Sequence, residues 1–89
     1  MLTVTKDAAT LIRSLLSKED RTGRSGLRIV VDPEHHSLSM SLAADPSSTD
    51  DVVQSDVARV FLSPSASRRL DKRTLRAATS ETRSSFFLD

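Results

Sequence analysis

Residues 27–42 form a stretch that reads LRIVVDPEHHSLSMSL and contains the clearest strand pattern of the chain. Its second half, Ser37–Leu42, alternates strictly between serine and a large apolar residue, which is the pattern of a half-buried strand. Its first half, Leu27–Val31, is rich in β-branched residues, as in a strand covered in places on both faces. The five residues between the two halves include a proline and an aspartate, which favour a turn. The stretch therefore predicts a β-hairpin that carries both histidines of the chain at or near its tip.

A short strand and a helix are expected before this hairpin. Leu2 and Val4 alternate with threonines, as in a strand. Thr5 is suited to cap the helix that follows, and Lys18 lies where a cation is favoured at its end. A segment with two glycines, Arg21–Gly26, then ends the helix. The residues expected on the buried face of the helix are Ala8, Leu11, Ile12, Leu15 and Leu16.

The second half of the chain is expected to consist of short strands around one short helix. Residues 44–51 contain a proline and three aspartates, which predicts a solvated loop with the aspartates as turn formers. Residues 52–53 and 58–62 are expected to pair as strands. Ser63 and Pro64 have the order of an N-cap and a first helical residue. Residues 74–79 and 84–88 are predicted as two closing strands joined at 80–83.

The resulting order is strand, helix, four short strands, short helix and two strands. An α+β fold, with antiparallel sheets that carry a helix on one side, satisfies this order most simply. The 89 residues are enough for one hydrophobic core, so we expect a single domain spanning 1–89. A homo-oligomer is compatible with so small a core.

The residue composition excludes some kinds of binding site and indicates where in the cell the protein is expected. No stretch is long and apolar enough to cross a membrane, and the N-terminus has neither the basic nor the apolar part of a signal peptide, so we expect a cytoplasmic protein without a membrane partner. The chain has no cysteine, which excludes a disulfide framework and a thiolate metal site.

Three segments together carry a family resemblance. They are Leu2–Ala9 with the apolar helix to Leu16, Gly26–Val31, and Val60–Pro64 with Leu70, Asp71 and Leu75. In this order and spacing they resemble the HesB-like, or A-type (IscA-type), iron–sulfur carrier family over nearly the whole chain. The resemblance implies a compact fold of short twisted, mostly antiparallel β-sheets with one long N-terminal helix and one short helix.

The chain departs from that family at the cluster ligands. The resemblance implies one cysteine in the loop after the second strand and two more in a Cys-Gly-Cys tail beyond the last strand. Here the loop reads Asp32-Pro33-Glu34-His35-His36-Ser37, and the sequence reaches Asp89 directly after the last expected strand. Iron–sulfur clusters are held by thiolates, with histidine only a partial substitute. We therefore expect a cysteine-less, degenerate member that carries no cofactor.

The turn at residues 32–36 suggests an alternative, a small metal-binding or metal-sensing protein. Imidazole and carboxylate groups are the ligands that such a site would use. However, adjacent residues point in divergent directions, and two histidines without a third at helical spacing form a weak metal signature. The competing interpretation is a set of solvated hairpin residues. The candidate metal ligands are Asp32, Glu34, His35 and His36.

A basic cluster suggests a partner-binding surface. From residue 57 onward the chain has seven Lys or Arg residues against three acidic ones, whereas residues 32–56 have six acidic residues and no Lys or Arg. Nucleic-acid binding is not indicated, because no aromatic residues for base stacking lie between the basic ones. A solvated helix face is the other interpretation. The candidate partner-binding residues are Arg68, Arg69, Lys72, Arg73 and Arg76.

The sequence contains none of the usual catalytic patterns. No Gly-x-Ser-x-Gly elbow or phosphate-binding glycine loop occurs, and both histidines share one loop. We therefore expect a non-catalytic accessory or protein-interaction module, with iron–sulfur assembly proteins or another protein as partner. The metal-binding protein is the alternative.

Overall fold

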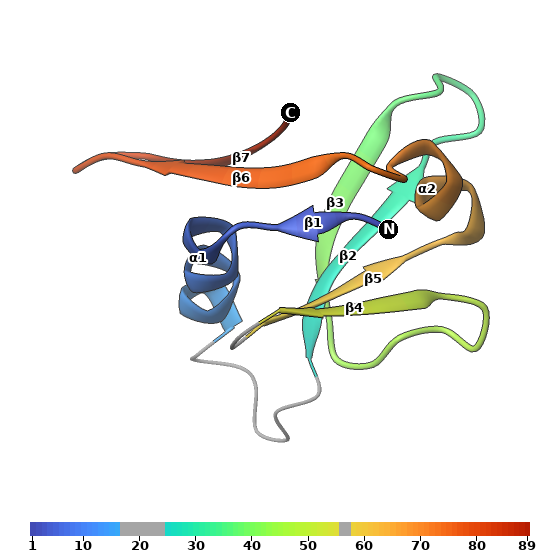
Figure 1. The fold of residues 1–89 in the computed structure, drawn as a ribbon, viewed down its shortest axis with the longest axis horizontal. Helices are drawn as coiled ribbons and strands as arrows, with labels where there is room; N and C mark the ends of the chain where they lie inside the picture. The colour runs from blue at the N-terminus through green and yellow to red at the C-terminus, as the bar shows by residue number, and fades with distance from the viewer. Residues whose placement is uncertain (17–24, 56–57) are drawn as a thin grey trace.

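The computed structural model describes residues 1–16, 25–55 and 58–89. Within these ranges the chain forms two α-helices and seven strands, arranged in two sheets (Figure 1). The expected α+β class is thus confirmed. The elements are β1 (Thr3–Val4), α1 (Lys6–Leu16), β2 (Gly26–Val31), β3 (Leu38–Ala43), β4 (Asp51–Ser55), β5 (Ala58–Leu62), α2 (Pro64–Arg69), β6 (Thr74–Thr79) and β7 (Ser84–Leu88).

The larger sheet has the strand order β3-β2-β5-β4. The predicted hairpin is present, with β2 and β3 antiparallel from the pair Gly26–Ala43 to the pair Val31–Leu38. The predicted pairing of β4 with β5 is also antiparallel, and β5 joins the hairpin by running parallel to β2. The parallel contact places the second half of the chain beside the first.

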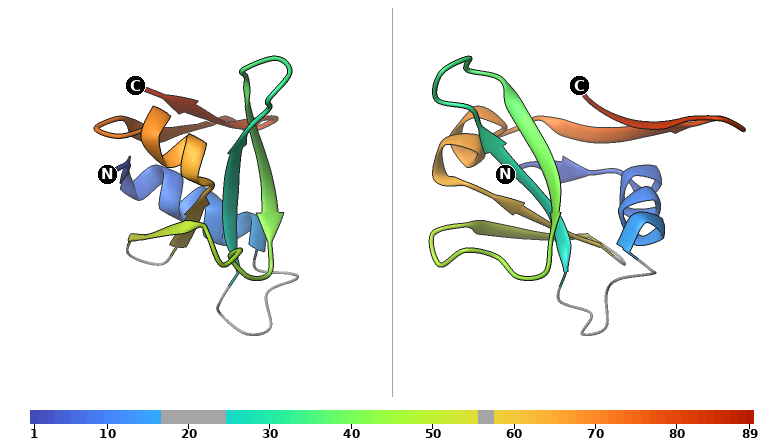
Figure 2. Two further views of the ribbon diagram at one scale, coloured as in Figure 1. Left: turned by 90° about the vertical axis from the view of Figure 1, so that its right-hand side faces the viewer. Right: turned by 180° about the vertical axis from the view of Figure 1, so that it is seen from behind.

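The smaller sheet has the order β1-β6-β7. Here β6 and β7 form the predicted closing hairpin, and β1 runs parallel to β6. Three of the five strand pairings among the described residues are therefore antiparallel and two are parallel. The β6–β7 hairpin extends past α1 at one end of the molecule, as the views in Figures 1 and 2 show.

Helix α1 packs against β5 and β6 and so joins the two sheets. Its N-cap is confirmed, because the Thr5 hydroxyl accepts a hydrogen bond of 3.2 Å from the Ala8 amide. The helix has 11 described residues. A longer helix stays a prediction, because Lys18 and the expected break from Arg21 lie outside the described residues. Helical spacing places Leu15 on the buried face, but Leu15 is 46% exposed, whereas Leu16 is buried.

Helix α2 begins as its sequence predicts. The Ser63 hydroxyl accepts a hydrogen bond of 3.3 Å from the Ala66 amide, and Pro64 occupies the first turn, where an amide donor is not needed. Ala66 is fully buried and Leu70 is 1% exposed. These two apolar residues pack this short helix against the core.

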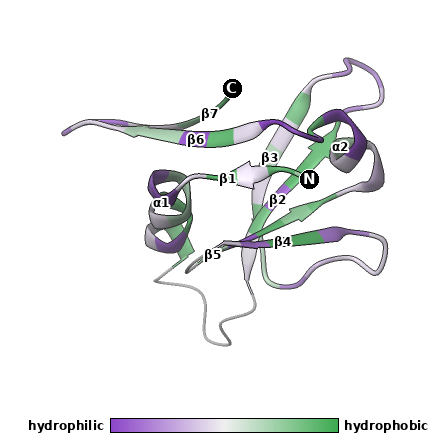
Figure 3. Ribbon diagram, viewed as in Figure 1, coloured by the Kyte–Doolittle hydropathy of each residue, from purple (hydrophilic) through white to green (hydrophobic). Residues whose placement is uncertain are grey.

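The core lies between the helices and the facing strands. Figure 3 shows hydrophobic residues concentrated along β2 and β5, in the middle of the larger sheet. Complete burial of a large aliphatic or aromatic side chain contributes about 1.5–3 kcal/mol, so these residues dominate stability. The largest fully buried side chains are Phe61, Ile12, Ile29, Leu62, Leu70, Leu75 and Val60.

Candidate functional site

The turn between β2 and β3 is organised by Asp32. Its amide donates a hydrogen bond of 2.8 Å to the Ser37 carbonyl, and its carbonyl accepts one of 2.8 Å from the His36 amide. Its Oδ1 also accepts a hydrogen bond of 2.9 Å from the Glu34 amide, which is the local aspartate turn that the sequence favours. His36 has a φ of 55°, in the left-handed region.

His35 and Asp32 form an exposed pair at this turn. The Nδ1 atom of His35 lies 3.0 Å from Oδ2 of Asp32. The hydrogen bond from His35, followed by that from the Glu34 amide, holds the pKa of Asp32 below its usual value of 3.8. The His35 side chain is 73% exposed, so solvent weakens the pair. The turn therefore positions one imidazole against one carboxylate.

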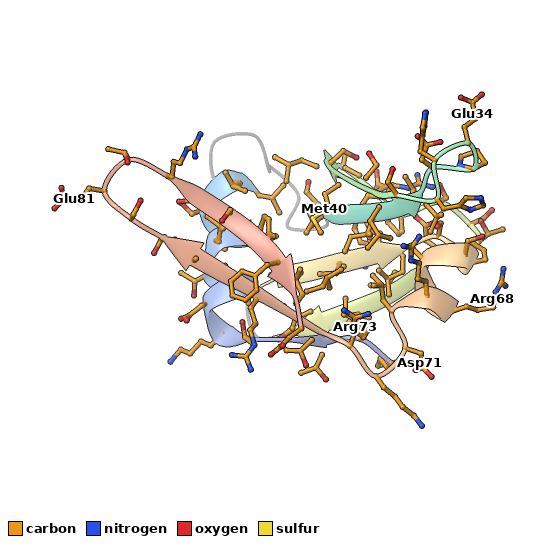
Figure 4. The ribbon with its side chains drawn as sticks, turned by 90° about the horizontal axis from the view of Figure 1, so that it is seen from above. Glu34, Met40, Arg68, Asp71, Arg73 and Glu81 are labelled. Atoms are coloured by element: carbon orange, nitrogen blue, oxygen red, sulfur yellow. The ribbon has the colours of Figure 1, made fainter. Side chains whose placement is uncertain are left out.

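The four candidate metal ligands do not come together as one set. Among the described residues, no group of three or more His, Cys, Asp or Glu side chains is placed to hold a metal ion. Glu34 extends outward from the hairpin tip in Figure 4. Asp32 and His35 are brought together, whereas Glu34 and His36 have exposed side chains. The metal hypothesis stays a prediction.

The basic cluster is spread over two places. Arg68 and Arg69 lie at the exposed end of α2. Arg73 donates a hydrogen bond of 2.9 Å from Nε to the Asp89 carbonyl, and Arg76 forms an ion pair of 2.9 Å with the Asp89 carboxylate. Lys72 lies between the two places, in a turn with a φ of 64°.

The structure brings the basic end of α2 against the histidine turn. Arg69 donates a hydrogen bond from Nη1 to the His36 carbonyl. Glu34 and Arg68 lie at the same end of the molecule in Figure 4. Two candidate sites that are separate in the sequence thus form one surface, which we call the tip surface: Glu34, His35, His36, Arg68 and Arg69.

A polar unit that no sequence motif indicates joins β2 to the loop before β4. Arg28 donates a hydrogen bond of 2.8 Å from Nη1 to the Ser47 hydroxyl, and its Nη2 lies 3.4 Å from Oδ1 of Asp50. The other carboxylate oxygen of Asp50 accepts a hydrogen bond of 3.0 Å from the Ser47 amide. The Asp50 side chain has no exposed surface, so this aspartate is not the solvated turn residue that the loop composition favours. The sequence signal that could have found it is Arg28, the single charged residue in the otherwise apolar run Leu27–Val31.

A hollow of about 320 Å³ lies beside α2 and β4. Its two carboxylates have partners: Asp51 accepts a hydrogen bond from the Ser67 hydroxyl, and Asp71 pairs with the N-terminal amine. The lining includes no histidine that could act as a base for Ser67. The residues lining the hollow are Met1, Leu2, Asp51, Val52, Val53, Leu62, Ser67 and Asp71.

Neither helix in the described part of the chain is both long and apolar enough to span a membrane. No family model and no curated protein sequence matches the chain.

Solved structures do match the fold. Escherichia coli SufA, described as involved in biosynthesis of iron–sulfur clusters, is 24% identical with a TM-score of 0.81 over 99% of this chain and 83% of SufA. IscA with its [2Fe-2S] cluster is 21% identical with a TM-score of 0.72 over 100% of this chain and 81% of IscA. A protein from Aquifex aeolicus is 19% identical with a TM-score of 0.76 over 99% and 89% of the two chains. The chain therefore has the HesB/IscA-type fold that its sequence resemblance implies.

Proposed function

We propose that this protein is a non-catalytic accessory module of iron–sulfur cluster assembly, which acts in the cytoplasm through protein contacts and holds no cluster on its own side chains. Two observations together support the proposal. The fold of SufA and IscA extends over at least 99% of the chain, and none of the 89 residues is a cysteine.

The donor groups of the chain do not fit an iron–sulfur cluster. Clusters of this kind are bound by cysteine thiolates, with histidine replacing at most part of the set. The turn where the resemblance expects the first cysteine instead holds the Asp32–His35 pair. A role that keeps the fold cannot use thiolate ligation, and the proposed role uses the surface instead.

The tip surface is the best-supported contact for a partner. Arg68 and Arg69 are exposed, and the hydrogen bond of Arg69 ends on a neutral carbonyl, which leaves its charge uncompensated by that contact. Arg73 and Arg76, by contrast, are both bonded to Asp89. Exposed charges steer encounters and select partners more than they add affinity. The surface favours a partner with an acidic contact region.

Affinity purification from the native cell, quantified by mass spectrometry, tests this proposal. The full chain is expected to retain iron–sulfur assembly proteins, and an Arg68→Glu, Arg69→Glu variant is expected to lose them. Arg83→Glu is a control for charge reversal at another exposed site, because Arg83 follows Glu81 at the opposite end of the molecule (Figure 4). Retention of no assembly protein by the full chain would overturn the proposed function.

A further inference from the structure

Strand β3 forms an open edge of the larger sheet. It is the first strand in the order β3-β2-β5-β4, so among the described strands it has a neighbour on one side only. Seen from behind in the right-hand view of Figure 2, β3 lies in front of β2 and no other described element covers it. An outer strand of this kind presents backbone groups that can pair with another chain.

The hydrogen-bond phase of the hairpin shows which backbone groups face the open edge. The Asp32 amide bonds to the Ser37 carbonyl, so Ser37 points its backbone groups toward β2. Because this direction alternates along an antiparallel strand, Ser39 and Ser41 also bond inward. The amide and carbonyl groups that face outward are those of Leu38, Met40 and Leu42.

The edge lacks the features that usually prevent pairing between chains. Residues 37–44 contain no charged residue, no proline and no glycine. Natural edge strands are commonly protected by charges, prolines or bulges. The outer strand β4 at the other side of the sheet, by comparison, carries Asp51.

The sequence of β3 is also self-complementary. Residues 38–42 read LSMSL, which is the same in both directions about Met40. In an antiparallel pair centred on Met40, Leu38 of one chain lies opposite Leu42 of the other, and Ser39 lies opposite Ser41. The same register places every outward-facing backbone group opposite another. The edge strand β7, read SSFFL, would place a serine opposite a leucine in the equivalent arrangement.

We propose that two copies of this chain associate through antiparallel pairing of their β3 strands, with the two-fold axis at Met40. The two larger sheets then form one continuous sheet. The pairs Met40–Met40, Leu38–Leu42 and Leu42–Leu38 each exchange two backbone hydrogen bonds. A contact of this type is isologous, so it closes as a dimer and does not propagate into a fibre.

The partial exposure of the apolar side chains of β3 supports a second copy of the chain as the partner. Leu38 and Met40 pack against the core but are only partly buried, and Leu42 is 41% exposed. All three share the core-facing side of the sheet, because they are paired with Val31, Ile29 and Leu27. In the proposed dimer these apolar side chains meet their counterparts, whereas Ser39 and Ser41 stay on the outer face.

A cysteine cross-link tests the register, because the natural chain contains no cysteine. Ser39 and Ser41 of the two copies form a pair without backbone hydrogen bonds, with Cα atoms about 4.5 Å apart, within the disulfide range of about 4.4–6.8 Å. We expect a mixture of the Ser39→Cys and Ser41→Cys variants to form a disulfide heterodimer in preference to either homodimer. Equal cross-linking of all combinations, or none, would overturn the register.

A charge test measures the association itself. Ser39→Lys with Ser41→Glu places opposite charges across the proposed interface, whereas Ser39→Glu with Ser41→Glu places like charges there. Both double variants have a glutamate at position 41, which is paired with Arg28 of β2 in the same chain. The contact of residue 41 with Arg28 is therefore the same in the two variants. Analytical ultracentrifugation is expected to show wild-type dimers and a dissociation constant about tenfold higher for the Glu–Glu variant than for the Lys–Glu variant. A folded wild type that stays monomeric at its highest soluble concentration, or equal constants for the two variants, would refute the dimer.

Discussion

The guanidinium of Arg28 lies 3.4 Å from the carboxylate of Asp50, whose side chain has no exposed surface. This contact connects β2, which is central in the larger sheet, to the loop that leads into β4. Ser47 completes the unit by bonding to both side chains. Polar contacts therefore fix the loop after β3 to the sheet.

Asp50→Ala should lower the free energy of unfolding by about 1–3 kcal/mol, because Arg28 and the Ser47 amide both lose a buried acceptor. Urea denaturation followed by circular dichroism measures the change. Ser48→Ala is the control in the same loop, because Ser48 is exposed and its replacement should change stability by less than about 0.5 kcal/mol. Equal stability of the two variants would show that the buried carboxylate contributes nothing.

Gly26→Ala should destabilise the protein by about 1–3 kcal/mol. A Cβ atom at this position would lie 2.5 Å from the Arg59 carbonyl oxygen and 2.9 Å from the Cζ atom of Phe61. The oxygen belongs to the neighbouring strand and Phe61 is fully buried, so neither can move easily. Thermal unfolding compares this variant with Ser84→Ala, at an exposed strand position. An unchanged midpoint in Gly26→Ala would contradict the close approach of β2 and β5.

His35→Ala should raise the pKa of Asp32 toward its usual value of 3.8, because the hydrogen bond from His35 is the largest cause of its lowering. A carboxylate with a lowered folded-state pKa stabilises the fold above its unfolded-state pKa, and this contribution is lost as the pH falls through the lower folded-state value. The His35 effect on stability should therefore be present above pH 3.8 and disappear below it. Carbon-13 NMR titration of the Asp32 carboxyl measures the shift, with His36→Ala as the control. No difference between the two variants would disprove the pairing.

Calorimetric zinc titration distinguishes the metal-binding alternative from the proposed accessory function. The proposed function predicts the same calorimetric isotherm for the wild type and for His35→Ala, His36→Ala, since two imidazoles without a converging third ligand form a poor site. If the double variant loses a saturable heat that the wild type shows, the turn at residues 32–36 binds metal and the alternative gains support.

The hairpin and the caps could be predicted because their signals are local. Strict alternation in Ser37–Leu42, and the order of Ser63 and Pro64, each specify a conformation within a few residues. The parallel contact of β2 with β5 joins residues about 30 positions apart and has no such signal. Leu15 shows the same limit, because helical periodicity gives the centre of a buried face and the packed strands decide its width.

The candidate site was predicted in parts that only the fold connects. The histidine turn and the basic residues were each visible in the sequence, but the contact of Arg69 with His36 depends on where α2 lies. Arg28 and Asp50 are separated by 22 positions and by the whole of β3, so neither suggests the other in the sequence. A single domain across residues 1–89 stays a prediction.

Whether the chain can hold a cluster is measured by anaerobic reconstitution with ferrous iron and sulfide, followed by desalting and iron and sulfide analysis. IscA, whose structure contains a [2Fe-2S] cluster, is the positive control under identical conditions. This protein is predicted to retain neither iron nor sulfide and to develop no cluster absorption, because it has the HesB/IscA-type fold without a thiolate. Iron and sulfide retained in stoichiometric amounts, with the visible spectrum of a cluster, would contradict the proposal that the protein holds no cluster.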